Sequence, residues 1–171
     1  IYAIGGDGTI NEAVNGIMNA VAKNDNLQSA PVLVPVPCGT GNDFVKTIDS
    51  TGKYAEFTHI VNSEPKGSEK YKSALKNLLN AAVDSCDNVK LMDMGYADGR
   101  YFINVASVGF DAEVAYNADK YKHKRFIPNS LAYYISVFTT LIKYRPKSVE
   151  IMYDDVFLEK GKITLLAVAN G

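Results

Sequence analysis

The apolar positions of the chain follow a helical period in three long segments. Residues 10–21, 68–84 and 130–143 each place apolar side chains on one face of a 3.6-residue repeat. Short apolar runs at 1–4 and 32–36 are typical of buried strands. Because strands and helices alternate over the first part of the chain, the pattern predicts an α/β arrangement there.

The pattern changes near Asn88, where strands become more frequent. The β-rich runs 89–96 and 100–108 flank Asp98-Gly99, a pair that is typical of a hairpin turn. We therefore expect a domain boundary near Asn88. Further helices and strands are expected at 112–122, 130–143, 148–153 and 162–170, with turn residues at Asp154, Asp155 and Gly161.

Two glycine-rich turns follow the first two apolar runs. The first is Gly5-Gly6-Asp7-Gly8-Thr9, and the second is Gly39-Thr40-Gly41-Asn42-Asp43. Glycines let the backbone approach phosphate oxygens, and the N-terminus of a following helix attracts an anion. Turns at the ends of neighbouring parallel strands face the same crevice, so the pair predicts a phosphate site. For the first turn alone, a tight turn solvated by its aspartate is the alternative.

Side-chain caps are predicted at two helix starts. Thr9 and Glu12 have the T-x-x-E spacing of a capping box, which predicts that Thr9 caps the first helix. Ser68 is the predicted cap of the helix at 68–84. That helix carries an apolar stripe and no candidate chemistry, so we interpret it as a packing helix.

Composition narrows the class of protein. The formal net charge of −1 argues against a nucleic-acid binder that relies on a basic surface. Cys38 and Cys86 have no metal-ligand spacing and indicate no disulfide scaffold, so we expect a cytoplasmic protein. No apolar run reaches the roughly 18–20 residues that span a bilayer, and no signal peptide is visible. Because the chain opens inside a strand without a methionine, we expect a fragment.

The glycine turns also carry a resemblance to a known family. Gly5 to Glu12, followed by Asn15-Gly16, and the stretch from Pro37 to Phe44 resemble the diacylglycerol kinase catalytic-domain family, with the bacterial soluble lipid kinases nearest. The segments Met92 to Gly95, Tyr101 to Asn104 and Gly109-Phe110-Asp111 resemble later motifs of the same family. NAD kinases and phosphofructokinases share the first motif. The second motif is more specific to lipid kinases.

The resemblance implies a fold and a division into domains. Residues 1–88 would form part of an α/β nucleotide-binding domain of phosphofructokinase-like type. Residues 89–171 would begin a β-sandwich domain with inserted helices that takes the lipid substrate. The first strand of the family is expected before Ile1, and the general base is expected beyond Gly171.

The resemblance also implies an activity. The expected enzyme is an ATP-dependent lipid kinase that transfers the γ-phosphate of ATP to the hydroxyl of diacylglycerol or a related lipid alcohol, with a role in phospholipid biosynthesis. The expected cofactors are ATP and Mg²⁺. Three alternatives stay open: an NAD kinase-like enzyme, a sphingosine or ceramide kinase-like enzyme, and a non-catalytic nucleotide-binding fragment.

The family motifs assign roles to particular residues. Asp7, Asp43 and Asp93 match catalytic aspartates, and Asp7 is the expected metal ligand. The expected nucleotide-binding residues are Gly5, Gly6, Asp7, Gly8, Thr9, Ile10, Asn11, Gly39, Thr40, Gly41 and Asn42. The alternatives are that Asp43 only charges the first turn of a helix and that Asp93 is an ordinary strand residue.

A lipid substrate implies contact with a membrane. The segment from Tyr121 to Tyr144 interleaves basic and aromatic residues before an apolar helix, which suits an anionic membrane surface. The alternative is a solvated helix end followed by a core helix, with a stripe formed by Leu131, Tyr134, Ile135, Phe138, Leu141 and Ile142. We therefore expect a cytoplasmic protein peripherally associated with the membrane, with a homodimer as one option.

Overall fold

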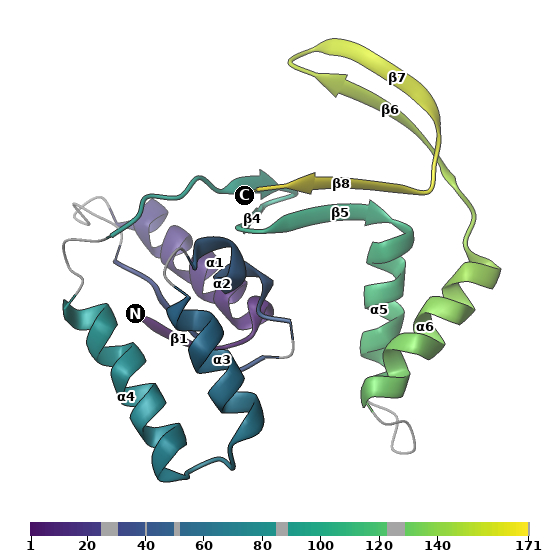
Figure 1. Cartoon of the computed structure of the whole chain (residues 1–171). Coiled ribbons are helices and arrows are strands. Elements are labelled where there is room, and N and C mark those ends of the chain that lie inside the picture. Colours follow the sequence, from purple (N-terminus) through teal and green to yellow (C-terminus); the bar gives the residue numbers. More distant parts are fainter. Residues whose placement is uncertain (25–30, 40, 50–51, 85–88, 123–128, 171) are drawn as a thin grey trace. The chain divides into compact units, whose positions relative to one another are not determined.

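The chain forms two compact units of mixed α/β structure (Figure 1). The computed structural model describes residues 1–24, 31–39, 41–49, 52–84, 89–122 and 129–170. The first unit comprises Ile1–Asn104 with Asn170–Gly171, and the second comprises Val105–Ala169. None of the helices in these ranges is long and apolar enough to cross a membrane.

The first unit opens with the predicted strand, turn and helix. Strand β1 (Tyr2–Gly5) runs parallel to β2 (Val34–Pro37), and Gly5 lies opposite Pro37. Helix α1 (Asp7–Lys23) follows the first turn. The predicted cap at Thr9 is wrong, because the helix begins at Asp7 and its N-cap residue is Gly6. The side chain of Glu12 instead forms an ion pair with Arg100, so it is not turned back to the helix start.

Three further helices complete the packing of this unit. They are α2 (Asp43–Ile48), α3 (Lys53–Ser63) and α4 (Glu69–Asp84). The cap at Ser68 is confirmed, since its hydroxyl accepts a hydrogen bond from the backbone N–H of Tyr71 at 3.2 Å. Tyr54 packs against both apolar clusters of the unit. Burial raises the pKa of Tyr54, and the charge of Asp49 raises it further.

A short hairpin belongs to the first unit as well. Strands β3 (Gly95–Ala97) and β4 (Arg100–Phe102) pair across Asp98 and Gly99, which both have positive φ angles, so the predicted turn is confirmed. Ile103, directly after β4, is buried in the same cluster as Ile10 of α1. The compact units divide after Asn104. The domain boundary expected near Asn88 stays a prediction. The change in the sequence pattern near Asn88 marks where the strands become more frequent. The hairpin β3–β4 belongs to the first unit because Ile103 is buried in the core of that unit.

The second unit combines two strand pairs with two helices. Strand β5 (Val105–Gly109) is antiparallel to β8 (Leu165–Ala169), and β6 (Lys147–Tyr153) is antiparallel to β7 (Val156–Ile163). The turn at Asp154 and Asp155 is confirmed. Gly161 is not a turn residue, because it lies within β7 opposite Val149. The strand predicted at 162–170 is divided at Thr164, whose carbonyl accepts the N–H of Phe110 at 2.9 Å.

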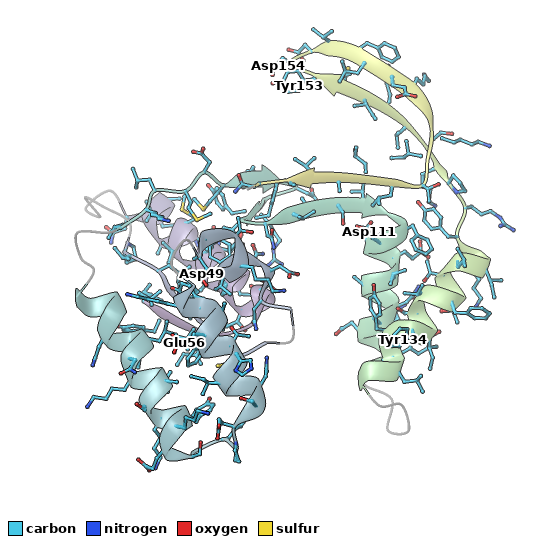
Figure 2. The ribbon with its side chains drawn as sticks, viewed as in Figure 1. Asp49, Glu56, Asp111, Tyr134, Tyr153 and Asp154 are labelled. Carbon is cyan, nitrogen blue, oxygen red and sulfur yellow. The ribbon has the colours of Figure 1, made fainter. Side chains whose placement is uncertain are left out.

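The two helices of this unit contact each other through small side chains. They are α5 (Phe110–Lys122) and α6 (Asn129–Lys143). The buried residues are Val114, Ala118, Ala132, Ser136 and Thr140. The apolar stripe of α6 instead faces outward: Tyr134 is 69% exposed and Phe138 is 65% exposed (Figure 2). The interpretation of α6 as a core helix that buries this stripe is therefore wrong.

Candidate functional site

The two glycine turns lie against each other at the ends of β1 and β2. The backbone N–H of Cys38 donates to the carbonyl of Gly5 at 2.9 Å, which continues the strand pairing into the turns. A Cβ atom added to Gly6 would lie 3.1 Å from the Cα of Gly39, and one added to Gly39 would collide with the backbone of Gly6. Glycine is therefore needed at Gly39, and a side chain at Gly6 would fit only if the turns moved apart by a few tenths of an ångström. The sequence predicted this juxtaposition from the parallel strands.

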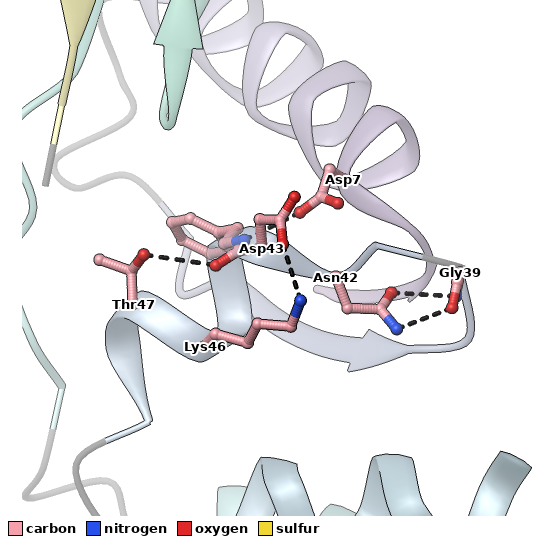
Figure 3. A network of polar contacts seen from close by, with 7 residues as sticks. Asp7, Gly39, Asn42, Asp43, Lys46 and Thr47 are labelled. Atoms are coloured by element: carbon pink, nitrogen blue, oxygen red, sulfur yellow. Dashed lines mark hydrogen bonds and ion pairs between the residues drawn. The ribbon is translucent and has the colours of Figure 1, made fainter. Parts of the chain in front are cut away.

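Asn42 fixes the shape of the second turn. Its backbone has a φ angle of 54°, a left-handed conformation that asparagine tolerates better than most residues. Its side-chain amide donates to the carbonyl of Gly39 at 2.7 Å and accepts the N–H of Gly39 at 3.0 Å (Figure 3). The side chain is thus occupied within the turn, and Asn42 is only 2% exposed. The nucleotide contact expected at Asn42 stays a prediction.

Asp7 joins the first turn to the second. Its Oδ1 accepts the backbone N–H of Phe44 at 2.9 Å. A Cβ atom on Gly41 would lie 3.3 Å from the Oδ2 of Asp7 and 3.4 Å from the Oδ2 of Asp43. Both carboxylates therefore border the same small space beside Gly41 (Figure 3). The absence of a side chain at Gly41 keeps this space open.

A lysine stands next to the two carboxylates. The Nζ of Lys46 lies 2.7 Å from the Oδ1 of Asp43, and both side chains are about two-thirds exposed. An exposed pair of this kind contributes little to stability. The charged groups next to the glycine turns are therefore the carboxylates of Asp7 and Asp43 and the ammonium group of Lys46.

These groups fit a magnesium–phosphate ligand. Mg²⁺ binds one or two carboxylates and keeps waters and phosphate oxygens in its remaining positions. Within the described ranges, no group of three or more His, Cys, Asp or Glu side chains could hold a metal ion by itself. No side chain in the described part of the chain caps the start of α1, so its first N–H groups can receive an anion.

The remaining predicted nucleotide-binding residues divide into several groups. Ile10 is fully buried in the core, so its side chain is not open to a ligand, and its nucleotide-binding role stays a prediction. The side chain of Thr9 lies against Gly5, and a Cβ on Gly8 would meet open space. The carbonyl of Asn11 accepts the side-chain amide of Asn15 at 2.9 Å. Thr40 lies outside the described residues.

Asp93 is placed differently from Asp7 and Asp43. It lies before β3 and is exposed, so it is not part of a described strand. Its backbone carbonyl accepts the side-chain amide of Asn170 at 2.7 Å. The atoms nearest the open side of Gly41 come from Asp7 and Asp43, and Asp93 is not among them. Its catalytic role stays a prediction.

Asn15 is a structural link that the sequence patterns did not reveal. It lies on α1 and is 8% exposed. Its side chain donates to the carbonyl of Tyr101 and accepts the N–H of Tyr101, both at 2.9 Å. The amide thus pairs with β4 as a neighbouring strand would, and it attaches the hairpin to the helix that follows the first turn. The signal in the sequence was Asn15 itself, because a polar residue on the buried face of a helix needs a hydrogen-bond partner.

Comparisons with known proteins agree with this geometry. The model of the family described as "Diacylglycerol kinase catalytic domain" matches residues 1–91, which include both turns. A protein named diacylglycerol kinase from Bacillus subtilis is 33% identical over 98% of this chain and 45% of its own length. Proteins of the same name from Staphylococcus epidermidis and Staphylococcus haemolyticus are 30% and 31% identical over 99% of this chain.

The coverage of these relatives is partial. The matches extend over 44% of the Staphylococcus epidermidis protein and 42% of the Staphylococcus haemolyticus protein. The chain thus spans less than half the length of the curated relatives described above. No solved structure matches the chain.

Proposed function

The chain belongs to the diacylglycerol kinase catalytic domain family, and we propose that the protein transfers the γ-phosphate of ATP to the hydroxyl group of diacylglycerol or a related lipid alcohol. The observation that carries the proposal is the contact of the two glycine turns through Gly6 and Gly39, with Asp7 bonded across them to Phe44. The family match covers every residue of this contact.

In this proposal the two turns bind the phosphate groups. Phosphoryl transfer asks a protein mainly for positioning and for stabilisation of charge. The N-terminus of α1 and the turn closed by Asn42 supply backbone N–H groups at the first and second turn. Asp7 and Asp43 would hold Mg²⁺, directly or through water, and the ion would supply positive charge that stabilises the phosphate groups. Lys46 adds a positive charge beside Asp43.

The finer fold assignment is part of the same proposal. The parallel pair β1–β2 with its glycine turns supports a phosphofructokinase-like nucleotide domain. The antiparallel pairs of the second unit support the beginning of a β-sandwich with two inserted helices. We propose that this strand-rich part receives the lipid.

The exposed stripe of α6 supports contact with a lipid surface. Phe138 and Leu141 are each about two-thirds exposed, and Lys143 and Arg145 follow them at the end of the helix. Apolar side chains beside cations suit an anionic membrane interface. We propose a protein that acts at the membrane surface from the cytoplasmic side; a homodimer stays a prediction.

The other enzyme readings have less support. The relatives that align along nearly the whole chain are named diacylglycerol kinases, whereas an NAD kinase would account only for the first turn. A sphingosine or ceramide kinase would share the lipid chemistry. The choice among lipids follows from an assay on a lipid panel.

The test is phosphate transfer by the natural protein. It is incubated with radiolabelled ATP and Mg²⁺. In separate assays the acceptor is diacylglycerol, sphingosine or ceramide in mixed micelles, or NAD in solution. We expect label in phosphatidic acid. Label in NAD phosphate with none in any lipid would overturn the proposal, and ATP binding without transfer would favour the non-catalytic alternative.

A further inference from the structure

Asn170 connects two separate backbone segments of the first unit, one at Asp93 and one at Ile103 and Asn104. It directly follows β8, where the chain returns to this unit. Its backbone N–H donates to the carbonyl of Asn104 at 2.7 Å. Its side-chain Nδ2 donates to the carbonyl of Asp93 at 2.7 Å and lies 3.5 Å from the carbonyl of Ile103. One carboxamide thus attaches Asp93 to the residues that follow β4.

Ile103, whose carbonyl lies near the same side-chain nitrogen of Asn170, is itself packed in the core. Ile103 is 5% exposed and packs in the same cluster as Phe44 and Val45. These two residues directly follow Asp43, and the N–H of Phe44 donates to Asp7. A continuous set of contacts therefore runs from Asp93 through Asn170 and Ile103 to α2, which begins at Asp43 and is bonded to Asp7 through the N–H of Phe44.

The local structure of Asp93 makes this attachment important. Residues 91–94 are exposed and precede β3, so neither a described strand nor the core restrains their side chains. Asparagine has a side-chain N–H group that can donate to a carbonyl, whereas aspartate and alanine have none. The loss of Nδ2 would leave the backbone of Asp93 free to move relative to Asp7 and Asp43.

We propose that Asn170 is a positioning residue, which holds Asp93 where its carboxylate can act on the magnesium–nucleotide. The inference rests on the proposed kinase function and on the predicted role of Asp93. Residues behind a metal site often contribute 10- to 100-fold in metal affinity or activity, which sets the expected size of the effect at about 10-fold or more.

The test compares Asn170→Ala and Asn170→Asp in the natural protein. We expect the Mg²⁺ concentration for half-maximal lipid phosphorylation to rise about 10-fold or more, because Asp93 is displaced. A second readout, independent of turnover, is the Mg²⁺-dependent binding of a fluorescent ATP analogue, which should weaken to a similar extent. In an Asp93→Asn background, Asn170→Ala should add little to either loss, since it acts through Asp93.

A matched control separates positioning from general destabilisation. Ser68→Ala removes one side-chain-to-backbone hydrogen bond from α4 in the same unit, and it should leave the Mg²⁺ requirement unchanged. The positioning role would be wrong if Asn170→Ala weakened binding of the ATP analogue equally in the wild type and in the Asp93→Asn background. It would also be wrong if Asn170→Ala left the Mg²⁺ requirement unchanged. If the wild-type protein phosphorylated no lipid, the proposed function would fail, and the ATP-analogue measurement would still decide the role of Asn170.

Discussion

The buried core of the first unit contains large apolar side chains, whereas the described buried residues of the α5–α6 pair are mostly small. Ile10, Phe44 and Val45 are almost fully buried around the glycine turns. In the helix pair α5–α6, the covered side chains include Ala132 and Ser136, while the larger residues of α6 face outward. The same helical periodicity therefore occurs in α1, where the apolar residues Ile10 and Val14 are buried, and in α6, where Tyr134 and Phe138 are exposed.

This difference shows what a stripe of apolar residues specifies. Periodicity identifies the residues that share one face of a helix, but it does not say which face meets a neighbour. In α6 the small side chains allow α5 to approach, and Asn117 donates to the hydroxyl of Thr140 at 3.0 Å across the contact. Close approach through small residues thus decided the packing, and the larger side chains remained available to another surface.

The strongest test of the comparison is a pair of phenylalanines. Phe44→Ala should lower the free energy of unfolding by about 3–5 kcal/mol, the usual cost of emptying a core position of this size. Phe138→Ala should change it by no more than about 0.5 kcal/mol, because the side chain is already exposed. Urea unfolding of the natural protein measures both.

The same exposed position tests the membrane contact. Phe138→Ala should reduce sedimentation with anionic phospholipid vesicles while leaving the unfolding midpoint unchanged. A large loss of stability for Phe138→Ala would mean that the stripe is covered in the natural protein, and the contrast between the units would then disappear.

The next effect concerns the chemistry of the first unit. Asp7→Asn should reduce phosphate transfer at least about 100-fold, the scale of losing one preorganised electrostatic contact. The amide oxygen can still accept the N–H of Phe44, so the melting temperature should change little. Asp49→Asn is the matched control, since Asp49 also accepts a backbone N–H, from Ala55, away from the turns. Full activity of Asp7→Asn would remove Asp7 from the metal site.

A smaller effect is expected where the hairpin joins α1. Asn15→Leu keeps the side-chain volume similar but leaves the N–H and carbonyl of Tyr101 without their partner, which should cost about 2 kcal/mol of stability. The exposed pair between Glu12 and Arg100 joins the same two elements, and Glu12→Gln should cost less than about 1 kcal/mol. Amide hydrogen exchange in β4 reports both changes. Equal exchange rates in Asn15→Leu and the wild type would contradict the proposed link.

Sequence reasoning succeeded where neighbouring residues determine the structure. The strand before Gly5, the cap at Ser68 and the hairpin turn at Asp98-Gly99 all depend on short segments, and all were predicted. The contact of the two glycine turns followed from a general rule for parallel strands.

Features that depend on distant residues were not predictable in the same way. Asn15 and Tyr101 are 86 positions apart, and their bonding places the hairpin in the first unit. Helix α1 begins at Asp7, and the side chains of Glu12 and Asp7 contact Arg100 and Phe44, which are distant in the sequence. The internal bonding of Asn42 depends on a left-handed backbone that the sequence GTGND does not specify by itself.

The hydrogen bond between Asp7 and Phe44 also bears on the choice of metal ion. It engages Oδ1, so Oδ2 is the end of the carboxylate that is directed to the space beside Gly41. The N–H of Phe44 uses part of the acceptor capacity of Oδ1, so Oδ2 is the freer oxygen of this carboxylate for a cation. Ca²⁺ often takes both oxygens of a carboxylate in a coordination shell of six to eight ligands, whereas Mg²⁺ is satisfied by single oxygens in an octahedron. In the proposed site, the bond from Phe44 would leave Oδ2 of Asp7 as a single-oxygen ligand, which is the kind of ligand that Mg²⁺ accepts.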